Sequence, residues 1–257
     1  MYSSIRQMIY HVKDAVLKQK YLTMAFGIWL FICCWWSASN IKEIFDFYQI
    51  SSCVADLLIR QQGSLYTGIM IFPITLILMT KYKQNSLNIQ CLLRYGSRER
   101  MLRSQIAEST VYSVSVSLLL LLMQCILGRT QVHSFINWDN MDSYYYLQTG
   151  ETASVGFWLV LTGIFLMYVI KFLLLLIILD LLMWHQKYLF AVWIIAVLFA
   201  AVGIFSKFKI FHEFFAFDMT SWARPWNFGL RFLLGIAIAA ILYILGVLLI
   251  RRKDLFH

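Results

Sequence analysis

The chain has 257 residues, of which 61% are hydrophobic, 17% aromatic and only 14% charged, and its formal net charge is +9. No soluble domain needs that much apolar surface, so the composition excludes a water-soluble protein and predicts an integral membrane protein of the all-α class. The positive charge does not indicate nucleic-acid binding, because the excess of Lys and Arg falls on segments at one side of the predicted membrane spans.

The start of the chain, residues 1–20, predicts an amphipathic helix on the cytoplasmic membrane surface. Its apolar residues recur at helical spacing, and its basic residues lie outside that stripe. The stripe consists of Ile5, Met8, Ile9, Val12, Val16 and Leu17. This segment is polar and basic rather than a cleavable signal sequence.

Six apolar stretches predict membrane spans at about 21–39, 64–80, 109–128, 153–183, 188–205 and 229–250. About 20 helical residues cross the ~30 Å hydrocarbon layer. The second stretch is short and carries Pro73, which usually kinks a helix. The fourth has 31 residues, so it must tilt, kink or project from the bilayer.

The distribution of Lys and Arg assigns a side to each connection between the spans. Six spans with both termini in the cytoplasm satisfy the positive-inside rule throughout. The chain is therefore predicted to be a single multi-pass domain of the plasma membrane. The external segment 206–228 is rich in Phe and Trp, which favours a position in or near the outer membrane interface.

The segment 81–103, between the second and third predicted spans, is strongly basic. Its charged residues are Lys81, Lys83, Arg94, Arg98, Glu99, Arg100 and Arg103. Apolar residues at helical spacing in 89–96 predict a short amphipathic helix. Gly96 and Ser97 predict a stop and an N-cap, and Glu99 is spaced to pair with Arg103 in a second helix. A short helix joined by a tight bend to a second helix is typical of an element that docks on a partner. The alternative is that the arginines only anchor the membrane topology and contact lipid headgroups.

Lys171 lies within the fourth predicted span. A lysine near the middle of a membrane costs roughly 2.5–3.5 kcal/mol on insertion scales, so it is expected to face the protein interior or a wet cavity. The alternative is that its side chain snorkels to the cytoplasmic interface. Asp180 is about 13.5 Å further along the helix, too far to be its direct partner.

Motifs for catalysis are missing from the sequence. A phosphate-binding loop needs a Gly-Lys pair, and the chain has none. His212-Glu213 begins like a zinc-protease helix, but Ala216 stands where the second histidine must be. The chain is therefore predicted not to be an enzyme and to hold neither a metal nor a cofactor of its own.

The run Arg94-Tyr95-Gly96-Ser97-Arg98, followed by Glu99-Arg100, is similar to the R-x-G-S-R pattern in the cytoplasmic loop of small permeases. As an architecture, the whole chain resembles a small permease subunit of type-2 ABC exporters, of the kind found in Gram-positive peptide-export and bacteriocin-immunity systems. The unusual length of the fourth span and Lys171 depart from that family.

The resemblance implies that the loop is a coupling helix seated on a separate cytoplasmic ATPase, which binds the ATP. The implied docking residues are Leu92, Leu93, Arg94, Tyr95, Gly96, Ser97, Arg98 and Glu99. It also implies pairing with a second permease copy or a sister permease in the lipid bilayer, no nucleic-acid partner, and an amphipathic or lipid-like cargo such as a peptide.

Two other functions remain open at this level. One is a stand-alone membrane protein that confers immunity by binding a toxin through its external aromatic segments. The other is an ion-coupled secondary transporter that uses Lys171 as a charge switch.

Overall fold

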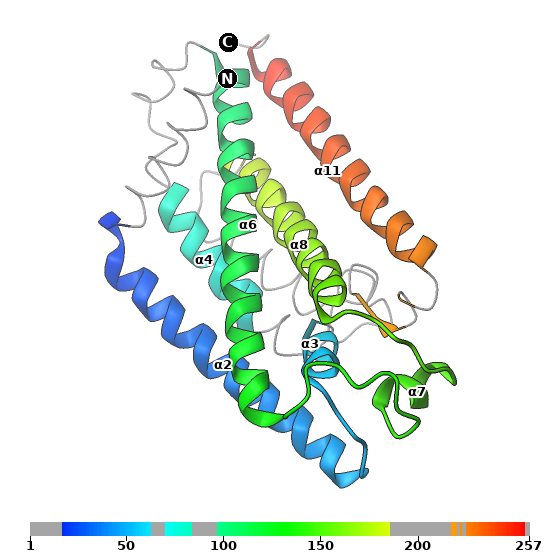
Figure 1. Cartoon of the computed structure of the whole chain (residues 1–257). Helices are drawn as coiled ribbons and strands as arrows, with labels where there is room; N and C mark the ends of the chain where they lie inside the picture. Colours follow the sequence, from blue (N-terminus) through cyan, green and yellow to red (C-terminus); the bar gives the residue numbers. More distant parts are fainter. Residues whose placement is uncertain are drawn as a thin grey trace.

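The computed structural model describes residues 17–62, 70–83, 97–185, 217–219, 222 and 225–254. Helices dominate these ranges (Figure 1). They are α2 (Lys20–Phe47), α3 (Val54–Gln62), α4 (Phe72–Lys83), α6 (Arg98–Gln131), α7 (Tyr144–Thr149), α8 (Phe157–His185) and α11 (Pro225–Asp254). A single parallel bridge between Ser51 and Ser143 is the only strand-like pairing in the described residues.

Four helices, α2, α6, α8 and α11, are long and apolar enough to cross a membrane. The predicted all-α membrane class is therefore confirmed, because lipid favours helices that satisfy their own backbone hydrogen bonds.

The predicted count of six spans is corrected to four within the described residues. The second stretch corresponds only to α4, whose 12 residues rise about 18 Å, and residues 63–69 before it lie outside the described part. The predicted fifth span, 188–205, also lies outside it, as does the predicted surface helix up to residue 16.

Helix α6 is the centre of the arrangement and contacts α2, α3, α8 and α11. It runs parallel to α2 and opposite to α8 and α11 (Figure 1). The bundle therefore has two ends. We call the end where α6 begins, and where α8 and α11 end, the basic end. The other end, where α2 and α6 finish and α7 lies, is the α7 end.

Small polar side chains line the face of α6 that is buried in the bundle. Ser109, Ser113 and Ser117 recur every four residues, and each is fully buried. Small residues at this spacing let neighbouring helices approach closely, which is how helices associate in lipid. Large apolar side chains on α2 and α11 stay exposed instead, as expected for surfaces that face lipid.

Helix α3 belongs to the core rather than to a surface connection. Apart from Arg60, the residues of α3 are buried, and the helix packs against α2, α6 and α8. The sequence predicted an external connection over 40–63, but α2 continues to Phe47 and α3 then enters the bundle. Figure 1 shows α3 at the α7 end, beside the lower half of α6 and below the start of α8.

A polar and aromatic contact fixes the N-terminus of α3. Asp56 accepts hydrogen bonds from the backbone N–H of Cys53 at 3.0 Å and from Nε1 of Trp138 at 2.8 Å. Trp138 stacks on Tyr145, with 4.6 Å between ring centroids. Burial raises the pKa of Asp56 to about 6, although both hydrogen bonds favour the charged carboxylate.

The tyrosine run 144–146 packs inward in part. Tyr144 and Tyr145 are buried, and the Tyr144 ring contacts Phe45 at 4.8 Å between centroids and lies under the Arg60 guanidinium at 4.9 Å. A run of tyrosines near a span end usually lies in the membrane interface. Here the first two instead join the α7 end to the core.

Two glycines offer a matched test of packing in the spanning helices. A Cβ added at Gly163 of α8 would lie 2.6 Å from Cε2 of Phe217, whereas one added at Gly27 of α2 would have nothing within 4 Å. We expect Gly163→Ala to lower the free energy of unfolding in detergent micelles by about 1–2 kcal/mol through overpacking. Gly27→Ala is expected to be neutral or to stabilise by up to about 1 kcal/mol. Equal effects of the two substitutions would contradict this packing.

Candidate functional site

The described part of the predicted docking segment forms the start of α6. Ser97 is its N-cap, with φ −154° and ψ 146°, and its Oγ accepts a hydrogen bond from the backbone N–H of Arg100 at 3.2 Å. Glu99 pairs with Arg103 at 2.8 Å. The predicted N-cap and the predicted ion pair are thereby confirmed. Residues 84–96, which include Leu92, Leu93, Arg94, Tyr95 and Gly96, lie outside the described residues.

Three polar side chains meet inside the bundle where this loop leaves α4. Lys83 is the last residue of α4, Ser109 lies on α6 and Asp180 lies on α8. Nζ of Lys83 lies 2.5 Å from Oδ1 of Asp180, and the Ser109 hydroxyl donates to Oδ2 of the same carboxylate at 2.5 Å. Nζ of Lys83 also donates to Oγ of Ser109. We call these three residues the Lys83 cluster.

The Lys83 cluster is almost completely removed from solvent. Lys83 and Asp180 are each 2% exposed and Ser109 is fully buried. A lone charge at this depth would be expensive, so each member depends on the others for compensation. Because its members belong to three helices, the cluster ties α4, α6 and α8 together near the basic end.

Further polar and aromatic contacts surround the cluster. Tyr82, next to Lys83, stacks on Tyr112 of α6 with 5.8 Å between ring centroids. The hydroxyl groups of Tyr82 and Thr23 are 2.5 Å apart, which extends the contact to α2. Glu108 is half-buried and interacts electrostatically with both Lys83 and Asp180. Helices α4 and α6, which flank the basic loop (residues 84–97), are thus connected to each other and to α2 and α8.

Sequence reasoning missed the Lys83 cluster. In the sequence, Lys83 stands out only as one charge of the basic segment 81–103, and Asp180 only as a residue too far from Lys171 to be its partner. A usable signal was present, since an acid inside the apolar run of the fourth span must find a compensating partner. The sequence alone does not identify that partner, because Lys83 and Asp180 are 97 residues apart.

Lys171 faces the protein interior and is fully buried. Its Nζ donates to the backbone carbonyl of Gln62, the last residue of α3, at 3.1 Å. A cation suits the C-terminal end of a helix, where unpaired carbonyls carry partial negative charge. The side-chain Oε1 of Gln62 accepts a hydrogen bond from the backbone N–H of Phe217 at 2.7 Å. Lys171 therefore holds α3 in place, and its use as a charge switch stays a prediction.

The described residues contain neither a candidate metal-binding group nor a disulfide. Within them, no group of three or more His, Cys, Asp or Glu side chains could hold a metal ion. Cys33, Cys34, Cys53 and Cys125 are free thiols, and the first three are buried.

Protein-family models, curated proteins and solved structures give no match to this chain.

Proposed function

We propose that the chain is the membrane-spanning permease subunit of an ABC exporter. In this proposal the long apolar helices span the plasma membrane, the basic end faces the cytoplasm, and the loop between α4 and α6 docks on a separate ATPase that binds and hydrolyses ATP. A second permease copy or a sister permease completes the pathway. The cargo is amphipathic or lipid-like, for example an exported peptide or a bacteriocin against which the system confers immunity.

The observation that carries this proposal is the continuity of α6. Its 34 residues rise about 51 Å from Arg98 to Gln131 without a break. The helix starts at the basic loop, because Ser97 caps its first turn. Helices are stiff along their axis, so a push at Arg98 displaces the whole helix and reaches the α7 end. A loop that receives movement from an ATPase needs such a continuous helix to transmit that movement across the membrane.

The Lys83 cluster supplies the second supporting observation. The loop leaves α4 directly after Lys83 and enters α6 at Arg98, so its two ends are attached to helices that the cluster joins. A movement of the loop is then transmitted to α4, α6 and α8 together rather than absorbed by one helix. Interiors packed this closely resist gradual deformation and favour two discrete arrangements.

Charge reversal at the start of α6 tests the docking role. We expect Arg98→Glu to reduce the ATPase activity that co-purifies with the tagged chain from native membranes by about tenfold or more, because buried or close charge pairs at an interface contribute strongly to binding. An acidic residue suits the first turn of a helix, so the substitution leaves α6 intact.

Lys20→Glu is the matched control for this experiment. It reverses a charge at the exposed first residue of α2, outside the loop, and is expected to leave the activity within about twofold of wild type. ATPase activity that Arg98→Glu retains in full, or a wild-type chain that exports its cargo from cells without any ATPase subunit, would refute the proposal.

An ion-coupled secondary transporter is the second candidate, and the buried charges favour it. Lys171, Lys83 and Asp180 all lie inside the bundle, where charged groups often belong to ion or proton pathways. Such a transporter moves its substrate in proteoliposomes under a proton gradient without ATP. Transport of that kind, abolished by Lys171→Met, would replace the exporter by this second function.

A further inference from the structure

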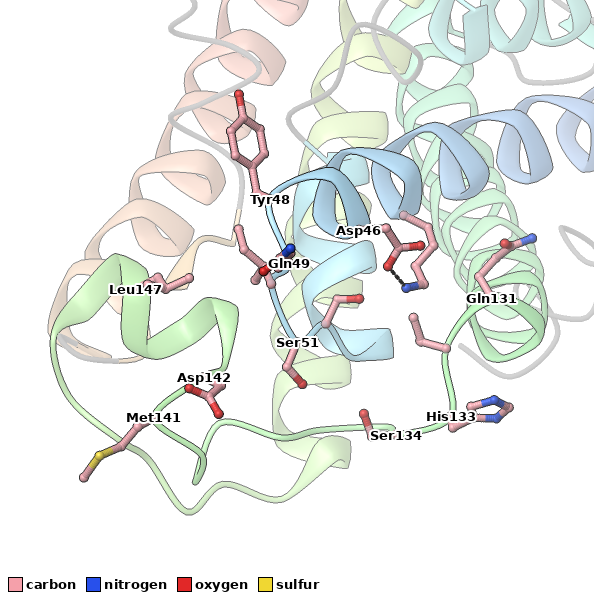
Figure 2. A pocket seen from close by; sticks show the side chains of 14 residues that line it. Asp46, Tyr48, Gln49, Ser51, Gln131, His133, Ser134, Met141, Asp142 and Leu147 are labelled. Carbon is pink, nitrogen blue, oxygen red and sulfur yellow. Dashed lines mark hydrogen bonds and ion pairs between the residues drawn. The ribbon is translucent and has the colours of Figure 1, made fainter.

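A groove of about 960 Å³ opens at the α7 end, the opposite end of α6 from Arg98. It lies between the end of α2, the end of α6 and the 141–147 segment (Figure 2). We propose that this groove binds a short cationic peptide segment that also carries apolar side chains. The inference goes beyond the proposed export function, since it concerns other residues and needs neither an ATPase nor ATP.

The electrostatics of the groove favour a cation. Helices α2 and α6 both finish at its edge, and their dipoles place partial negative charge there, of which Arg129 in the last turn of α6 offsets a part. The lining also contains the carboxylates of Asp46 and Asp142 against one lysine, Lys42. Figure 2 shows Asp46 on α2 and Asp142 across the groove from it.

The two carboxylates differ in what already neutralises them. Asp46 forms an ion pair with Lys42 one turn before it. Asp142 is exposed, and no ion pair joins it to another described residue. A ligand ammonium or guanidinium group therefore has Asp142 as its first partner. Ser52 adds a hydroxyl that is buried in the lining and has no hydrogen-bond partner among the described residues. Such a group favours a polar ligand atom.

The floor of the groove is rigid before any ligand arrives. The backbone of Ser51 donates to the Asp142 carbonyl at 3.3 Å and accepts from the N–H of Tyr144 at 3.3 Å. The amide of Asn137 donates to the Ser51 carbonyl at 3.0 Å. These bonds fix the backbone of Asp142 relative to Ser51, four residues after the end of α2, which lowers the entropic cost of binding.

The size and the apolar part of the lining favour a peptide over a single small cation. A volume of about 960 Å³ lies at the upper end of the range for small-molecule sites. The apolar lining side chains are Tyr48, Ile50, Val132, Met141 and Leu147. Met141 is 71% exposed, and flexible methionines are common on surfaces that bind varied peptides. A peptide with basic and apolar side chains matches both parts of this surface.

Binding is tested with the purified chain in nanodiscs of zwitterionic phosphatidylcholine, so that lipid charge attracts no probe. The probe is a fluorescein-labelled peptide of about nine residues in which lysine and leucine alternate, an extended length of about 30 Å. Fluorescence anisotropy is expected to show saturable binding. Replacing the lysines by glutamate is expected to abolish it, and Asp142→Lys is expected to weaken it by about tenfold or more.

Asp139→Lys is the matched control, because it makes the same charge change at an exposed position of the same loop outside the lining. It is expected to change the affinity by less than about twofold. Equal losses in both variants, or non-saturable binding that empty nanodiscs reproduce, would overturn the proposal. If spermidine displaces the labelled peptide at an equal concentration, the groove is a site for a small polyamine. That result would overturn the assignment to a peptide. The assay contains no ATPase, so its outcome is independent of the exporter proposal.

Discussion

Lys83→Met is expected to lower the free energy of unfolding by about 3–5 kcal/mol, because it leaves the carboxylate of Asp180 buried without its ammonium partner. Lys83 and Asp180 are each 2% exposed and 2.5 Å apart. Asp180→Leu is expected to have a similar effect through the unpaired lysine. Equilibrium unfolding of the detergent-solubilised chain measures both values.

A double-mutant cycle distinguishes the free energy contributed by the ion pair from the free energy lost through poorer packing. The double variant Lys83→Met/Asp180→Leu removes both charges and is expected to recover most of the lost stability, since apolar residues often replace a buried ion pair at little cost. Arg103→Met, which breaks the exposed pair with Glu99, is the control and is expected to cost less than about 1 kcal/mol. Additive losses in the double variant would contradict a direct pair between Lys83 and Asp180.

Lys171→Met is expected to release the C-terminal end of α3 and to lower the free energy of unfolding by about 2–3 kcal/mol. The lysine donates a charged hydrogen bond to the carbonyl of Gln62, and its loss leaves a buried acceptor without that donor. Hydrogen–deuterium exchange gives the specific readout. Amides of α3 are expected to exchange faster, while those in the middle of α6 keep their protection.

Leu174→Met is the matched control for this experiment, since it introduces methionine one turn further along α8 at another buried position. Apolar exchanges of similar volume usually cost less than about 1.5 kcal/mol, so α3 is expected to keep its protection in this variant. Unchanged exchange of α3 in Lys171→Met would show that the lysine does not support that helix.

The predicted membrane class and the helical nature of the spans follow from composition and local pattern. Long apolar stretches in lipid must satisfy their backbone hydrogen bonds within one segment, so they become helices whatever their neighbours are. The start of α6 was predictable for the same reason. The Ser97 cap and the Glu99–Arg103 pair join residues three and four positions apart, and such contacts depend on local geometry alone.

Tertiary structure alone decided where the polar groups went. Helix α3 contains Asp56, Gln61 and Gln62, which suggests a surface connection, yet all three are buried. Their partners come from distant chain segments. Nε1 of Trp138 donates to Asp56, Nε2 of Gln61 donates to the carbonyl of Cys34, and the carbonyl and side-chain oxygens of Gln62 accept from Lys171 and from the backbone N–H of Phe217. The spacing of residues along one helix does not indicate hydrogen-bond partners that lie far away in the sequence.

The same distinction holds for the candidate sites. The basic loop and the charge of Lys171 were visible in the sequence, because a charge beside or inside an apolar stretch stands out by itself. The Lys83 cluster joins three helices, and the groove at the α7 end is made by the ends of two helices and a loop. These sites exist only because packing brings together groups that are far apart along the chain, and burial then requires that their charges and hydrogen bonds be matched.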